Sequence, residues 1–258
     1  MKQGFFEIKE NRQIAPGVFR LTLNGDTSGI SRAGQFVDVH VDGHFLRRPF
    51  SLCDWDDESL TVVYRTVGNG TKDLSAAPVG ARLDLLTGLG NGFDTALSGP
   101  RPLLIAGGSG VPMMLALAKQ LLREGKTVTA VLGYRTKQDI FLAEEIAALG
   151  AQVLITTEDG SAGTKGLVTD VMHDLDYTYF YTCGPEAMFR AIDQTARTSG
   201  QFSFEARMGC GYGACMGCTI QTANGPRRVC KDGPVFTREE IRETVLGAHG
   251  TEESGGQS

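Results

Sequence analysis

Residues 208–218, MGCGYGACMGC, hold three cysteines, and a fourth follows in RRVCKDGP. Four residues separate Cys210 from Cys215, two separate Cys215 from Cys218, and eleven separate Cys218 from Cys230. This is the plant-type spacing of a 2Fe–2S cluster. The intervening glycines let the backbone wrap closely and direct N–H groups at the sulfurs. The spacing therefore predicts an iron–sulfur site with Cys210, Cys215, Cys218 and Cys230 as its ligands.

The sequence gives less support to two other roles for these thiols, a zinc site and disulfide bonds. Structural zinc sites favour a C-x2-C pair on both sides, and only one such pair occurs here. Disulfides suit an oxidising compartment, and the charged N-terminus, MKQGFFEIKENRQ, has no signal-peptide core. Cys53 and Cys183 lie outside the motif, and we expect both to be small buried hydrophobic residues.

Composition narrows the class of protein. The chain has 258 residues, a net charge of −5 and a pI near 5.4, so nothing favours binding to nucleic acid or an anionic membrane. Its longest apolar run, VPMMLALAKQLL, is too short for a membrane span. We expect a cytoplasmic protein of two domains with an appendage.

Residues 1–98 contain short β-type runs that end at glycine or Asn-Gly, and no useful helical pattern. Val37, Val39 and Val41 alternate with polar residues, including Asp38, which predicts one wet face. We predict an antiparallel barrel.

From residue 99 to about 206, apolar strands alternate with helical segments, expected at 111–124, 139–149, 166–173 and 185–197. This order predicts a parallel five-stranded nucleotide-binding sheet with helices on both faces. Residues 207–258 should fold around whatever the cysteines hold, and we expect the small polar tail, GTEESGGQS, to be disordered.

Two glycine-containing turns in the second domain could hold a nucleotide. IAGGSGVPMM (105–114) joins a strand to a helix, whose N-terminus can bind a pyrophosphate. TCGPEAM (182–188) is a second such turn, and both should lie at the carboxyl edge of the sheet. A bare strand-to-helix turn also favours glycine, so one loop alone is weak evidence. The acidic pair in TEDGS (157–161) mildly disfavours a 2′-phosphate on the adenosine ribose.

In the barrel, RRPFS (47–51) and YRTVGNGT (64–71) are the notable stretches. Arg48 could pair with a diphosphate, Ser51 could bond a flavin edge, and Tyr64 could stack on a ring. Gly70 and Thr71 could offer N–H donors to a phosphate. The plainer alternative is that the arginines are solvated and Tyr64 is core. His40 and His44 form no recognisable ligand set.

Taken together, RPFS, GNGT, GGSGVPMM and TCGPEAM resemble the ferredoxin–NADP reductase superfamily. With the cysteine loop and CKDGPVF added, nearly the whole chain resembles the electron-transfer subunits of NAD-dependent dihydroorotate dehydrogenase. The resemblance implies an FAD-binding barrel over 1–98, an NAD-binding domain over 99–206 and a 2Fe–2S domain over 207–258. It assigns FAD to Arg48, Pro49, Phe50, Ser51, Val63, Tyr64, Arg65, Gly70 and Thr71, and the nicotinamide nucleotide to Gly107, Gly108, Gly110, Cys183, Gly184 and Pro185. One departure is Gly88, which stands in LTGLGNGF where the family usually has proline.

The resemblance also implies a mechanism and a partner. A separate FMN-containing subunit would oxidise dihydroorotate, and electrons would run through the cluster and FAD to NAD+ in pyrimidine biosynthesis. The two subunits would form a heterotetramer with the cluster at their interface. No acid–base residue of this chain is required. Small subunits of NAD(P)H–ferredoxin oxidoreductases and of sulfite reductase-type complexes look similar in outline, and a zinc-stabilised interaction module is the non-enzymatic alternative.

Overall fold

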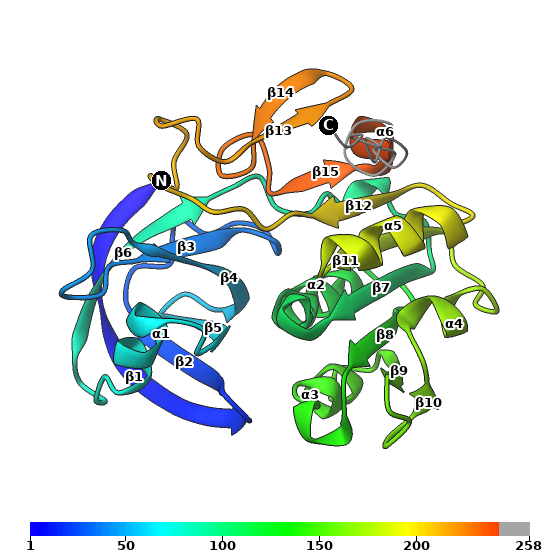
Figure 1. The fold of residues 1–258 in the computed structure, drawn as a ribbon, viewed down its shortest axis with the longest axis horizontal. Helices are drawn as coiled ribbons and strands as arrows, with labels where there is room; N and C mark the ends of the chain where they lie inside the picture. The colour runs from blue at the N-terminus through cyan, green and yellow to red at the C-terminus, as the bar shows by residue number, and fades with distance from the viewer. Residues whose placement is uncertain (243–258) are drawn as a thin grey trace, which may run out of the picture.

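The computed structural model describes residues 1–242 as three connected parts (Figure 1). A barrel is formed by the N-terminal residues, an α/β domain lies beside it, and the C-terminal residues lie over both. The tail predicted to be disordered lies outside the described residues. Within residues 1–242 no helix is long and apolar enough to cross a membrane.

The N-terminal part is the predicted antiparallel barrel, closed by six strands in the order β1-β2-β5-β4-β3-β6. The strands are β1 (Lys2–Ala15), β2 (Val18–Asn24), β3 (Phe36–Val39), β4 (Arg48–Trp55), β5 (Ser59–Arg65) and β6 (Arg82–Leu89). The sequence did not reveal α1 (Asn69–Ser75), a short helix that follows β5. The expected wet face of β3 is wrong at Asp38, which is 2% exposed because the cysteine loop covers it.

The second part confirms the five predicted strands, which pair in parallel. They are β7 (Pro102–Gly107), β8 (Thr129–Tyr134), β9 (Gln152–Thr157), β11 (Tyr179–Cys183) and β12 (Gly200–Ser203). The predicted helices are present with shorter bounds: α2 (Val111–Arg123), α3 (Ala143–Ala148), α4 (Val168–Met172) and α5 (Glu186–Thr195). Single 3-10 turns occur at η1 (Thr95–Leu97), η2 (Gly108–Gly110) and η3 (Lys137–Asp139).

The sheet has seven strands rather than five. One added strand is the two-residue β10 (Thr164–Lys165), at the edge beside β9. The other is β15 (Val235–Thr237), which pairs antiparallel with β12 and comes from the C-terminal region. This region also holds a hairpin of β13 (Thr219–Thr222) and β14 (Gly225–Arg228), and α6 (Arg238–Ile241). The C-terminal region is therefore continuous with the nucleotide-binding sheet.

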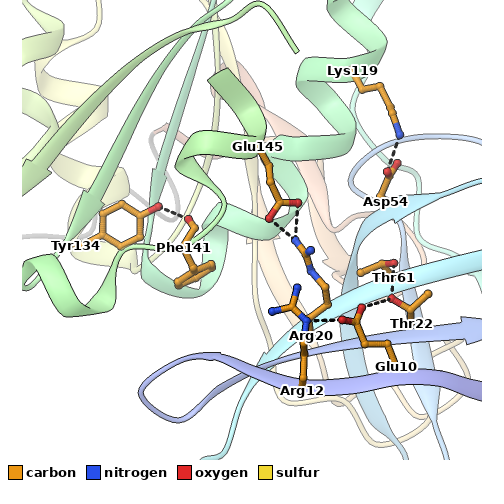
Figure 2. A network of polar contacts seen from close by, with 10 residues as sticks. All are labelled: Glu10, Arg12, Arg20, Thr22, Asp54, Thr61, Lys119, Tyr134, Phe141 and Glu145. Carbon is orange, nitrogen blue, oxygen red and sulfur yellow. Dashed lines mark hydrogen bonds and ion pairs between the residues drawn. The ribbon is translucent and has the colours of Figure 1, made fainter. Parts of the chain in front are cut away.

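The barrel and the α/β domain share a core. Helix α2 packs against β4, and Cys53 on β4 is fully buried in one cluster with Met113 and Leu117 of α2. Burial raises the pKa of Cys53 to about 12, which confirms its expected role as a buried hydrophobe. Two ion pairs cross the same interface: Lys119 with Asp54, at 2.5 Å, and Arg20 with Glu145 (Figure 2). The two domains are thus held together by apolar packing and by charge.

Candidate functional site

A cavity of about 940 Å3 opens between the barrel and the α/β domain. Nine of the sequence-predicted binding residues line it: Pro49, Phe50, Ser51, Val63, Tyr64 and Arg65 from the barrel, and Gly107, Gly108 and Pro185 from the α/β domain. The other six, Arg48, Gly70, Thr71, Gly110, Cys183 and Gly184, lie behind or beside this lining. One cavity therefore brings together the motifs that were separate in the sequence.

The barrel wall of the cavity is aromatic. The rings of Phe50 and Tyr64 lie 5.3 Å apart at 43°, and the rings of Phe19 and Tyr64 are stacked at 5.8 Å. The Tyr64 hydroxyl donates to Asn11 Oδ1 at 3.1 Å, and burial raises its pKa. Because the hydroxyl is occupied inside the barrel, Tyr64 offers the cavity its ring. A planar group such as a flavin fits this wall.

Arg48 lies over the start of α1. A Cβ built on Gly70 would come within 2.7 Å of the Arg48 guanidinium, so a larger residue there would displace the guanidinium from its present position. The Thr71 hydroxyl accepts from the backbone N–H of Val67 at 2.9 Å and caps the helix. The His44 ring lies between Arg48 and Asp73, with Nδ1 3.3 Å from the guanidinium and Nε2 2.8 Å from the carboxylate. The sequence analysis assigned no role to His44, because its spacing from His40 matches no ligand set.

The two glycine turns of the α/β domain meet at one edge of the sheet, as predicted. Cys183 is in register with Ala106, and a Cβ on Gly110 would lie 2.1 Å from the Cys183 carbonyl oxygen. The absence of a side chain at Gly110 therefore allows this close backbone contact. Gly108 has a φ of +51° and open space where a Cβ would be, next to the cavity. Cys183 itself is fully buried and does not line the cavity.

Two acidic residues of the cavity extend the sequence analysis. Glu205 was not predicted; it accepts a hydrogen bond from Ser109 at 3.3 Å, and desolvation at the cavity wall raises its pKa although the residue keeps solvent contact. The two acidic residues of TEDGS have different surroundings. Asp159 accepts hydrogen bonds from the N–H and the hydroxyl of Ser161. Of the two, Glu158 is the residue that lines the cavity.

The four motif cysteines approach as two pairs. The Cys215 N–H donates to Cys210 Sγ at 3.5 Å, and the Cys230 N–H donates to Cys218 Sγ. Cys218 and Cys230 are buried at 5% and 2% exposure, whereas Cys215 is exposed. Over residues 1–242 no three Cys, His, Asp or Glu side chains converge as one bound ion would require. Two pairs of cysteines fit a 2Fe–2S cluster, in which each iron takes two of the four thiolates.

Backbone N–H groups point at the sulfurs, as the glycine-rich sequence led us to expect. Ala214 N–H donates to Cys210 Sγ at 3.2 Å, and Cys230 N–H to Cys218 Sγ at 3.4 Å. Burial raises the pKa of Cys210, but hydrogen bonds from the backbone of Cys215 and its neighbours outweigh it and bring the pKa to about 6. The loop thus favours the thiolate, the form that binds iron, at Cys210, whereas burial and the neighbouring Cys218 raise the pKa of Cys230 to about 12.

The cysteine loop is fixed to the barrel. A Cβ on Gly211 would lie 2.4 Å from Asp38 Oδ2, so the loop sits directly on this buried carboxyl group. Burial raises the pKa of Asp38 to about 6, and its Oδ1 has no hydrogen-bond partner in the described part of the chain. Arg228 donates to the carbonyl of Gly213 at 2.8 Å and pairs with Asp232 at 3.0 Å, which holds the two cysteine segments together.

The glycine-rich residues that follow β6 also contact the cysteine region. The Asn91 side chain donates to the carbonyls of Val235 at 2.7 Å and Asp232 at 3.2 Å, and accepts from the N–H of Val235 at 3.1 Å. A Cβ on Gly90 would meet Pro234 at 2.5 Å. This segment joins the barrel to the cysteine region.

Comparisons with known proteins agree with this geometry. Residues 205–242 match the iron–sulfur cluster binding domain of dihydroorotate dehydrogenase B, and residues 104–194 match the oxidoreductase NAD-binding domain. The chain is 42% identical to the electron transfer subunit of dihydroorotate dehydrogenase B (NAD(+)) of Geobacillus sp. (strain WCH70), over 93% of this chain and 99% of the relative. The chain is also 39% identical to the same subunit of Bacillus pumilus (strain SAFR-032), over 93% of this chain and 98% of the relative.

Solved structures support the fold. An NADH-dependent reduced ferredoxin–NADP oxidoreductase structure superposes with a TM-score of 0.84 at 29% identity, covering 95% of this chain and 94% of the other. A cytochrome P450 reductase of Amycolatopsis gives a TM-score of 0.66 at 22% identity, covering 75% and 66% of the two chains. The second likeness concerns the fold alone.

Proposed function

Given that this chain belongs to the family of electron-transfer subunits of NAD-dependent dihydroorotate dehydrogenase B, we propose that it carries electrons from a dihydroorotate-oxidising subunit to NAD+. The observation that carries the proposal is the cavity of about 940 Å3 between barrel and α/β domain, with the cysteine loop fixed against the barrel beside it. This function requires three cofactors, which are FAD, a 2Fe–2S cluster and NAD.

The residues divide the work by chemistry. Phe50 and Tyr64 face the flavin, while Arg48, held by Gly70 and His44, pairs with its diphosphate. When bound, FAD exchanges a hydride with the nicotinamide and single electrons with the cluster. Gly107, Gly108 and Pro185 hold the nucleotide against the flavin, and the chain contributes position rather than a proton-transfer residue of its own.

The partner is an FMN-containing catalytic subunit, and we assign its docking face to the cysteine loop. Cys215 is exposed, and so are Tyr212 and Met216, at 48% and 53%. Two exposed apolar side chains beside an exposed ligand are expected of a face that another subunit covers. We propose a heterotetramer with both subunits in equal number, acting in the cytoplasm in pyrimidine biosynthesis.

The test is anaerobic reduction of the protein isolated with its native partner. Dihydroorotate should bleach the flavin and cluster bands between about 400 and 550 nm, and NAD+ should restore them. Cys215→Ser should remove the cluster contribution and leave the flavin bands. Bleaching by NADH or NADPH but not by dihydroorotate would contradict the proposal. It would instead favour a ferredoxin oxidoreductase subunit, the second candidate that the 0.84 TM-score supports.

A further inference from the structure

One end of the cavity is formed by a short segment between η3 and α3. Asp139 and Phe141 line the cavity there. The buried Tyr134 hydroxyl donates to the carbonyl of Phe141 at 2.7 Å, and the two rings meet edge to face at 5.8 Å. Leu142 follows with a φ of +64°, a left-handed conformation that is costly for leucine. Such a residue persists only where its surroundings hold it.

The outer end of this segment is held by the barrel. Arg20 of β2 reaches across the domain interface and places one terminal nitrogen 2.6 Å from both carboxylate oxygens of Glu145 (Figure 2). The Arg20 side chain is 15% exposed and that of Glu145 49%. A half-exposed pair adds little to overall stability, so its main effect is on the position of the groups that it joins.

We propose that Arg20 and Glu145 are a positioning pair for the nicotinamide nucleotide. The connection runs from Arg20 on the barrel to Glu145 on α3, through the strained Leu142, to the Phe141 wall of the cavity. The barrel, which holds the flavin wall, thereby sets where the α/β domain places its nucleotide wall. The inference rests on the proposed function, in that the cavity receives the nucleotide.

Charge reversal tests the pair in the complete complex. Arg20→Glu and Glu145→Arg should each raise the KM for NAD+ by about five- to tenfold, with kcat changed by less than about twofold. The double reversal should bring the KM back to within about twofold of the natural protein. Arg101→Glu is the matched control, because Arg101 is 48% exposed and pairs at 3.1 Å with Asp176 within the α/β domain.

Each outcome decides the matter. An Arg20→Glu protein with full FAD and cluster content and an unchanged KM overturns the inference, as does a double reversal no better than the single changes. If Arg20→Glu loses FAD, Glu145→Gln replaces it at the more exposed position, and an unchanged KM there overturns the inference equally. Titration of NADH by fluorescence separates the two proposals: natural protein that binds no NADH defeats the proposed function, whereas equal binding by natural and reversed proteins defeats only the pair.

Discussion

Asn91→Ala should loosen the cysteine region from the barrel. The change removes three hydrogen bonds and leaves the N–H and carbonyl of Val235, a residue 5% exposed, without their Asn91 partners. Unsatisfied buried groups cost about 1–3 kcal/mol each, so the two Val235 groups together should make opening easier by roughly 2–6 kcal/mol. Because each 1.36 kcal/mol is tenfold, amide exchange over residues 229–237 should accelerate by at least about 30-fold.

Hydrogen exchange measured by mass spectrometry on the loaded protein checks this. Asn224→Ala is the matched control, since Asn224 is exposed in the β13–β14 turn. Asn91→Asp should lie between the natural protein and Asn91→Ala, because it keeps the acceptor for the Val235 N–H. Equal exchange in Asn91→Ala and Asn224→Ala would refute the reasoning and move the anchor to β15 alone.

Four other substitutions separate the roles of single residues. Arg48→Ala should release FAD during gel filtration, since the guanidinium is the cation over α1; FAD retained at full content would contradict the assignment. Gly110→Ala should cut the yield of folded protein, because its Cβ would lie 2.1 Å from a carbonyl oxygen, whereas Gly108→Asn, which puts a residue that tolerates a left-handed φ into open space, should fold and raise the KM for NADH; the order of the two yields is the check. Asp38→Asn should raise the melting temperature. Burial raises the pKa of Asp38 from 3.8 to about 6. The natural protein therefore loses stability as pH rises from 3.8 through 6, because the carboxylate is less favourable in the folded state than in the unfolded state. The stability gained by Asp38→Asn should be larger at pH 7.5 than at pH 5 by about 1 kcal/mol. A gain that shrinks as pH rises would show the opposite sign.

Local sequence patterns predicted those features of the structure that depend on residues close together in the sequence. The cysteine spacing, the barrel alternation and the strand-to-helix turns are all read within a few residues, and each corresponds to a feature of the structure. Helix α1 was missed because seven residues that include a glycine carry no helical periodicity. Strand β15 was missed because its three residues pair with a strand more than thirty residues away.

Residues that depend on tertiary contacts could not be found in this way. Asp38 has the alternation of an exposed position, and only the loop over it makes it buried. His44 and Glu205 are single polar residues with no spacing partner, yet one contacts Arg48 and the other lines the cavity. Glu158 and Asp159 are adjacent in sequence, but local hydrogen bonds turn only Asp159 away.

The cysteine region is more than an appendage, because it is fixed to both domains. Strand β15 extends the nucleotide-binding sheet, and Arg238 of α6 pairs with Asp193 of α5 at 2.6 Å. On the other side, Asn91 and the Asp38–Gly211 contact hold it to the barrel. A shift of the barrel against the sheet would therefore strain the cluster loop as well as the cavity. Electron transfer from cluster to flavin and hydride transfer from flavin to nucleotide both depend on position, so a single domain interface controls both steps.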